Sequence, residues 1–130
     1  MIEGSCHCGA VRWSFKGVPD TATACSCTVC RRYGTLWAYD FEGEGIEVSG
    51  PTTVYTPATD IGFHFCPSCG GLAYWRGLRQ RDDGRRRIAV NLRLAEDPQA
   101  VGGVVVKHLD GFGDWTYLPR DARCVADMWF

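Results

Sequence analysis

Short alternations of apolar and polar residues, separated by Gly, Pro and Asp, run through most of this chain. This pattern predicts β-strands at residues 10–15, 21–24, 36–41, 46–49, 54–55, 62–65, 72–75, 88–92 and 104–108. Helical periodicity is scarce, and predicts only short turns of helix at residues 28–33 and, after Asp97, at 98–101. We therefore expect a mainly β fold of short antiparallel strands, each too short to bury much surface alone.

Size and composition place this pattern in one domain. The chain has 130 residues and is 45% hydrophobic, so residues 1–130 are expected to fold as a single domain with a core of its own. A chain of this size still gains substantially from a structural metal.

The charge-rich run from Arg79 to Arg87 contains two aspartates, which favours a solvated hairpin tip over a nucleic-acid surface.

Seven of the eight cysteines fall into three tight clusters, and their spacing is that of metal ligands. The clusters are Cys6 and Cys8, then Cys25, Cys27 and Cys30, then Cys66 and Cys69. A tetrahedral zinc with Zn–S bonds of about 2.3 Å holds its sulfurs roughly 3.8 Å apart, which short Cys-x-Cys and Cys-x-x-Cys turns can supply. A zinc shared by the first and third clusters would join segments far apart in the sequence and stabilise the fold.

If Cys6, Cys8, Cys66 and Cys69 close one four-thiolate zinc site, the middle cluster forms a second site with three ligands and one open position. Closed zinc sites are structural, and open ones are catalytic. The alternative is a second closed site, whose fourth ligand would come from a residue elsewhere in the chain: Cys124, His7, His64 or His108. His7 itself is expected on the surface, because alternation along a strand points it away from its cysteine neighbours.

A zinc with three thiolates carries a net charge of −1, so it is a weak Lewis acid and is poorly suited to hydrolysis. Its soft character instead favours a substrate thiol as fourth ligand, held as the reactive thiolate. Arg31 and Arg32 directly follow Cys30, where they would offset this charge or bind a substrate carboxylate, or else form a solvated helix face.

Cysteines used as metal ligands need a reducing compartment. The N-terminus lacks the basic and apolar regions of a signal peptide, and no apolar stretch approaches the roughly 20 residues of a membrane span. The net charge of −1 gives no field for polyanions. We expect a cytoplasmic protein that binds neither nucleic acid nor membranes and whose thiols stay free for zinc.

Three motifs in order give a specific resemblance: Gly-Ser-Cys-His-Cys-Gly-Ala-Val at 4–11, Cys-Ser-Cys-Thr-Val-Cys-Arg-Arg at 25–32 and Phe-Cys-Pro-Ser-Cys-Gly at 65–70. With the Leu-Ala-Glu-Asp-Pro turn at 94–98, this arrangement closely resembles the glutathione-dependent formaldehyde-activating enzyme family, which also includes centromere protein V. The resemblance implies a β-tent of the Mss4-like kind. It also implies a structural zinc on Cys6, Cys8, Cys66 and Cys69, and a catalytic-type zinc on Cys25, Cys27 and Cys30.

The activity implied by the resemblance is the condensation of formaldehyde with glutathione to S-hydroxymethylglutathione, which is a carbon–sulfur lyase reaction run in reverse. The leading hypothesis is therefore a zinc enzyme whose partner is a low-molecular-weight thiol, with glutathione as the thiol that the resemblance names. The alternative hypothesis is a non-catalytic, zinc-stabilised binding module. The late segment from Lys107 to Trp115 only loosely matches the family's His, Lys and Trp pattern, so no glutathione-binding residues are assigned.

Overall fold

The computed structural model describes residues 1–129, which form ten strands and four short helical elements. The strands are β1 Ile2–Ser5, β2 Arg12–Phe15, β3 Thr21–Cys25, β4 Trp37–Phe41, β5 Ile46–Ser49, β6 Thr53–Tyr55, β7 Ile61–Phe65, β8 Leu72–Gly77, β9 Arg87–Asn91 and β10 Val105–Leu109. The helices are α1 Cys30–Tyr33 and α2 Pro98–Gly102, with 3₁₀ turns η1 Leu92–Leu94 and η2 Val125–Met128. Among the described residues, none of the helices has the length and apolar character needed to cross a membrane.

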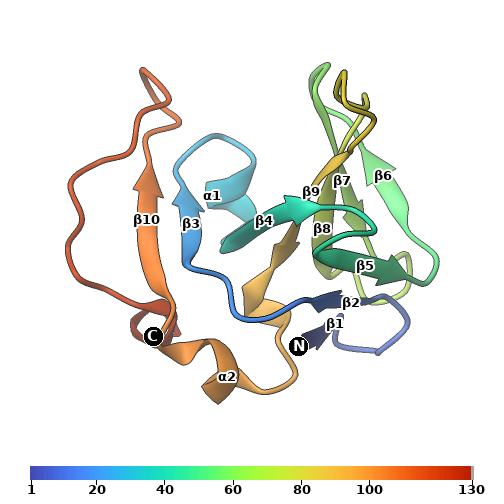
Figure 1. Ribbon diagram of the computed structural model, residues 1–130, viewed down its shortest axis with the longest axis horizontal. Coiled ribbons are helices and arrows are strands. Elements are labelled where there is room, and N and C mark those ends of the chain that lie inside the picture. Colours follow the sequence, from blue (N-terminus) through green and yellow to red (C-terminus); the bar gives the residue numbers. More distant parts are fainter. Residues whose placement is uncertain (130) are drawn as a thin grey trace.

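The strands form two sheets, and the larger one carries the candidate site. The small sheet has the order β1-β2-β5, and the large sheet has the order β10-β3-β4-β9-β8-β7-β6. Figure 1 shows the large sheet curving from β10 on one side to β6 on the other, with β1, β2 and β5 below it. The loop after β10 and the loops between β6 and β7 and between β8 and β9 form two projections at the top of this view, with a gap between their ribbons.

Alternation along the strands gives the large sheet two buried faces. On β4, Ala38 packs into the main core, whereas Trp37 belongs to a second cluster on the opposite face. On β9, Ile88 and Val90 likewise face the main core, and Ala89 faces the second cluster. The main core fills the space between the two sheets, and the second cluster holds the middle cysteines.

The prediction of a mainly β fold is confirmed, and each predicted strand overlaps an observed one. The pattern missed β1, because its second inward position is Gly4, which has no side chain to signal burial. A Cβ at Gly4 would overlap the ring of Trp13, so the strand needs glycine where it pairs with β2. One pair is parallel rather than antiparallel: β10 runs beside β3, with Leu109 opposite Cys25.

Candidate metal centres

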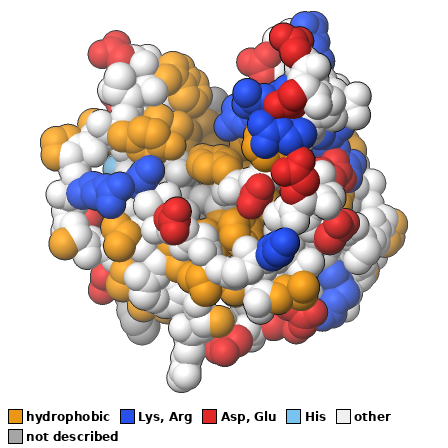
Figure 2. All heavy atoms as spheres, in the orientation of Figure 1, with side chains coloured by type: hydrophobic (Ala, Val, Ile, Leu, Met, Phe, Trp, Pro, Cys, Tyr) orange, Lys and Arg blue, Asp and Glu red, His pale blue; other side chains and the backbone are white. Residues whose placement is uncertain are grey.

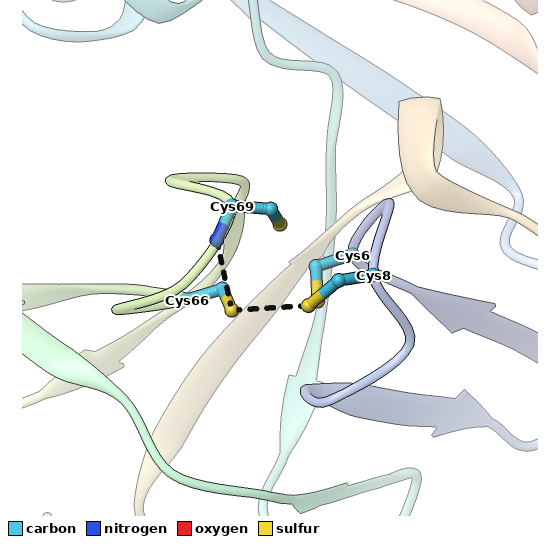
Figure 3. Close-up of side chains that lie close together, drawn as sticks. All are labelled: Cys6, Cys8, Cys66 and Cys69. Carbon is cyan, nitrogen blue, oxygen red and sulfur yellow. Dashed lines mark hydrogen bonds between the residues drawn. The ribbon is translucent and has the colours of Figure 1, made fainter.

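Two groups of cysteines in this structure could hold metal ions. The first group is Cys6, Cys8, Cys66 and Cys69, and their sulfurs all lie within 4.8 Å of one another. Figure 3 shows the four side chains brought together by two loops, one after β1 and one between β7 and β8. The Sγ atoms of Cys6 and Cys8 are 3.6 Å apart, and those of Cys8 and Cys66 are 3.5 Å apart. These separations are close to the roughly 3.8 Å expected around a tetrahedral zinc.

Backbone N–H groups surround the sulfurs of this group and favour the thiolate forms of Cys66 and Cys69. Although the N–H of Ala10 opposes the shift, hydrogen bonds with Cys66 and Cys6 raise the pKa of Cys8 to about 11. Val11 donates to Cys6 Sγ at 3.3 Å, and Ser68 donates to Cys66 Sγ at 3.4 Å. The pKa of Cys66 is lowered, first by the N–H of Cys69, and the pKa of Cys69 is lowered to about 6 by backbone donors. Thiolates are the form that binds metal, so the loops are preorganised for a cation.

The two loops turn at glycines that directly follow the last cysteine of each cluster. Gly9 and Gly70 have φ angles of +80° and +76°, in the left-handed region that bulkier residues rarely adopt. Gly9 N–H donates to the carbonyl of Cys6, and Gly70 N–H donates to the carbonyl of Cys66. Each loop therefore closes on its own first cysteine.

The second group is Cys25, Cys27 and Cys30, called here the triad, whose sulfurs also lie within 4.8 Å of one another. Cys25 ends β3, Cys30 begins α1, and Cys27 lies in the turn between them. The N–H of Cys30 donates to Cys27 Sγ at 3.3 Å, so the start of the helix turns toward the sulfurs. Trp37 Nε1 donates to Cys30 Sγ at 3.3 Å from the neighbouring strand β4.

Protons are shared unequally within the triad. A hydrogen bond with Cys30 lowers the pKa of Cys25 to about 6, although partial burial opposes the shift. The pKa of Cys30 is raised, because of the same hydrogen bond with Cys25 and because of burial. Cys25 therefore ionises more readily than Cys30.

The loop after β10 packs directly on the triad, a contact that the sequence did not predict. Ser26 N–H donates to the carbonyl of Leu109 at 3.1 Å, and Gly111 N–H donates to Ser26 Oγ at 3.0 Å. A Cβ at Gly111 would overlap the backbone of Cys27, so glycine is required for this close approach. The Asp-Gly-Phe-Gly sequence at 110–113 marks a turn, but nothing in it indicates a neighbour 84 residues earlier.

Changing Gly111 to alanine is expected to loosen metal at the triad, because the added methyl group must displace the Cys27 turn. Zinc analysis after gel filtration should show the loss of about one metal ion per chain, with the four-cysteine site still filled. Gly103→Ala is a matched control, since no atom lies within 4 Å of a Cβ added there and its φ is −85°. Retention of both metals in Gly111→Ala would show that the loop does not support the triad.

Cys124 does not serve as a fourth ligand to the triad. It pairs with Val105 at the start of β10, whereas the triad lies at the other end of that strand, beside Leu109. Four residues along a strand span about 13 Å, far beyond ligand distance. Cys124 instead begins η2, where its N–H and Sγ lie 2.9 and 3.3 Å from Asp127 Oδ2.

The histidines are also placed away from the triad. His7 is exposed, as predicted, and His108 Nε2 lies 3.3 Å from Asp121. His64 is buried beside Thr52 Oγ1 at 2.8 Å, and burial lowers its pKa to about 4, so it stays neutral at physiological pH. Within residues 1–129, no fourth His, Cys, Asp or Glu joins the three sulfurs.

A cavity of about 710 Å³ opens beside the triad, between the two projections. Five aromatic side chains line it with the three cysteines, and only Asp60 and Arg87 bring charge; the aromatic residues are Trp37, Tyr39, Phe63, Trp75 and Trp115. In Figure 2 the surface is hollowed between the projections, with hydrophobic side chains on its walls. A concave, mainly apolar cavity with a few polar groups is the usual form of a small-molecule site.

The arginines singled out in the sequence lie outside this cavity, apart from Arg87 at one end of the charged run. Arg31 is exposed and stacks over Phe112, with 5.4 Å between the guanidinium carbon and the ring centre. Arg32 is also exposed and donates to the carbonyl of Thr28 at 2.8 Å. The rest of the run, residues 79–86, forms the solvated tip between β8 and β9, as predicted, and Arg87 begins β9.

Comparison with known proteins identifies a family and a similar solved structure. The model of the family described as glutathione-dependent formaldehyde-activating enzyme matches residues 1–105, a segment that contains all seven clustered cysteines. The crystal structure of a Rhodobacter sphaeroides protein, a structural genomics target, is similar with a TM-score of 0.59 and 29% sequence identity. The match covers 80% of this chain and 98% of that protein. No curated protein matches the sequence significantly.

Proposed function

The chain belongs to the glutathione-dependent formaldehyde-activating enzyme family, and from this premise we propose that it is a zinc enzyme of carbon–sulfur lyase type. Its reaction joins a low-molecular-weight thiol to a small electrophilic carbon such as the carbonyl carbon of formaldehyde, or reverses that step. One observation carries the proposal: among residues 1–129, the triad presents three sulfurs and no fourth protein ligand at the wall of a cavity large enough for a substrate.

Zinc fits both groups of cysteines by donor type and spacing. All seven donors are sulfurs that lie within 4.8 Å of the others in their group, and thiolates select soft or borderline metals such as zinc over calcium or magnesium. Cys6, Cys8, Cys66 and Cys69 would hold a structural zinc, and Cys25, Cys27 and Cys30 would hold the second ion. A zinc ion held by three thiolates would supply a position for the substrate sulfur and keep that sulfur ionised.

The residues around the triad supply the rest of the chemistry. Burial raises the pKa of Tyr39, so its hydroxyl remains a hydrogen-bond donor that can point at the carbonyl oxygen of a substrate in the cavity. Trp37 donates to Cys30 and fixes one wall of the site. In the addition, the carbon–sulfur bond forms as the carbonyl π bond breaks. The oxygen then takes up the proton that the thiol released, so no oxidant or reductant is needed.

The four-cysteine site would be structural. It joins the loop after β1 to the turn between β7 and β8, and Cys6 and Cys66 are each only 1% exposed. All eight cysteines are free thiols. We therefore place the protein in the cytoplasm, where thiols stay reduced and available to zinc.

Catalysed exchange between formaldehyde and a thiol tests this function. With the zinc-loaded protein, exchange NMR should show that formation and breakdown of S-hydroxymethylglutathione are faster than the uncatalysed reaction and saturate with glutathione. The same measurement with cysteine and other small thiols shows whether glutathione is the preferred thiol substrate. Exchange at the uncatalysed rate with each thiol would contradict the proposal and favour a non-catalytic binding module.

Metal removal should distinguish the two sites. Cys27 lines the open cavity and is partly exposed, and the triad offers three ligands on one short segment. The other site has four ligands whose loss also costs folding energy. A chelator titration should therefore release one zinc per chain first, with no change in circular dichroism, and the second only as the chain unfolds. Concerted release of both ions with unfolding would show that the sites are equivalent.

A further inference from the structure

The cavity beside the triad is much larger than formaldehyde. With two heavy atoms, formaldehyde takes up about twice the roughly 30 Å³ of a water molecule. The cavity measures about 710 Å³, on the order of ten times more. A site of this volume fits a drug-sized ligand rather than a one-carbon substrate.

Glutathione itself matches the lining of the cavity poorly. It is a tripeptide with two carboxylates, an ammonium group and two peptide bonds, and each of these groups needs a partner when buried. The lining offers only Asp60 and Arg87 as charged side chains, and both are exposed residues. The charged and peptide groups of such a thiol are therefore better placed toward solvent. The apolar part of the cavity is then left for the substrate that supplies the electrophilic carbon.

One face of the large sheet forms the apolar part of the cavity. Trp37 and Tyr39 point the same way from β4, and Trp75 on β8 and Phe63 on β7 are paired residues on that face. The ring centres of Tyr39 and Trp75 lie 5.8 Å apart with their planes tilted by 51°. Aromatic rings prefer to meet edge to face or in offset stacks. Rings tilted in this way can therefore make such contacts with a further planar group in the cavity.

Trp115 provides the opposite wall from the loop after β10. Its side chain is 60% exposed although it is large and apolar, and its φ of +56° lies in the left-handed region. A bulky residue in that conformation is strained, and such strain gathers at ligand sites. Trp115 also lies beyond residue 105, where the match to the family model ends. This wall is therefore a feature of the chain that the family match does not include.

We propose that the carbon component of the substrate is an aryl aldehyde, whose ring lies among Trp37, Tyr39, Trp75 and Trp115. The inference rests on the proposed function, because it assigns the cavity to the carbon that the triad's thiol partner attacks. The thiolate sulfur bonds to the aldehyde carbon, the carbonyl π bond opens, and the oxygen receives the proton given up by the thiol. The product is an aryl hemithioacetal.

Benzyl mercaptan tests the aryl site, because it carries the sulfur, the carbon and the ring of the adduct and lacks the rest of the thiol molecule. Calorimetric titration of the zinc-loaded protein should give a dissociation constant about 30-fold lower for benzyl mercaptan than for ethanethiol. Benzyl alcohol, which keeps the ring and lacks sulfur, should also bind and compete with benzyl mercaptan.

Two substitutions locate the ring. Trp75→Leu and Trp115→Leu should each reduce the advantage of benzyl mercaptan over ethanethiol by about fivefold. Trp75 is 5% exposed, so its replacement can prevent folding, whereas Trp115 is 60% exposed. If Trp75→Leu does not fold, Trp115→Leu alone tests the position of the ring. Tyr55→Leu is the matched control, since Tyr55 is a half-exposed aromatic residue on β6 that does not line the cavity. It should leave the advantage unchanged.

The outcomes separate this inference from the proposed function. Equal affinities for benzyl mercaptan and ethanethiol would overturn the aryl site, even if formaldehyde addition is catalysed. Tight binding of benzyl alcohol, lost in Trp115→Leu, would support the aryl site even if no thiol addition is catalysed. An aryl advantage that survives both tryptophan substitutions would place the ring elsewhere and would also overturn the inference.

Discussion

Replacing Cys66 with serine is expected to remove most of the stability of the fold. Cys66 is 1% exposed, its sulfur lies 3.5 Å from Cys8 Sγ, and it accepts the N–H groups of Ser68 and Cys69. Structural zinc binding contributes about 10 to 16 kcal/mol in small zinc domains, which is comparable to the whole stability of a domain. The free energy of unfolding should fall by about 5 kcal/mol, and the melting temperature by roughly 20 °C.

A thermal melt of the zinc-loaded protein, followed by circular dichroism, measures this effect. Cys124→Ser is the matched control, because Cys124 lies outside both cysteine groups and, within residues 1–129, its sulfur hydrogen-bonds to Asp127 alone. Its melting temperature should change by no more than a few degrees. If Cys66→Ser melts like the control, the four-cysteine group does not support the fold.

Replacing Cys27 with serine is expected to separate activity from stability. Cys27 lies in the turn between β3 and α1, is partly exposed and lines the cavity. The change should remove metal from the triad and lower the rate of thiol addition at least about 100-fold, as for other groups that hold the reacting centre. The melting temperature should fall by less than about 5 °C, because Cys25 and Cys30 keep their packing against the second cluster.

Zinc analysis, exchange NMR and a thermal melt on the same preparation test this prediction. Cys124→Ser again serves as the control and should keep two metals and full activity. If Cys27→Ser melts as low as Cys66→Ser, both cysteine groups are structural and the protein is better described as a zinc-stabilised binding module.

Local patterns in the sequence were enough to predict nine of the ten described strands and the grouping of the cysteines. β4 and β9 were recognisable as short apolar runs, because each strand buries side chains on both faces of the large sheet. Short turns set by neighbouring residues explain each cluster of cysteines, and the union of the first and third clusters followed from the four ligands that close a zinc site. The match over residues 1–105 agrees with the resemblance carried by the same three motifs.

Contacts between distant segments could not be predicted. β10 pairs in parallel with β3 across about 80 residues, and only this pairing brings Gly111 against Cys27. Asn91 is another example, because a single buried amide accepts the N–H of Leu36 and donates to the carbonyl of Leu72. A polar residue at the end of a strand gives no signal of such a role.

The aromatic cavity was also beyond the sequence analysis. Tryptophan and tyrosine residues are common in cores, and the sequence alone does not show which of them share a cavity. Trp37, Tyr39, Trp75 and Trp115 come from three separate segments and meet only because β4 and β8 flank β9, with the loop after β10 facing them. The position of the triad at the wall of this cavity is what turns a metal-binding motif into a candidate active site.

The most direct test of the account is whether the triad accepts an added thiol. Cobalt is loaded selectively at the triad after the first zinc is removed by chelation, and glutathione is then titrated. The account predicts a saturable rise in sulfur-to-cobalt charge-transfer absorption, equal in the wild-type protein and Cys124→Ser, and lost in Cys27→Ser. A spectrum that does not change at saturating glutathione would show that the triad has no position for a substrate thiol, and would contradict the account.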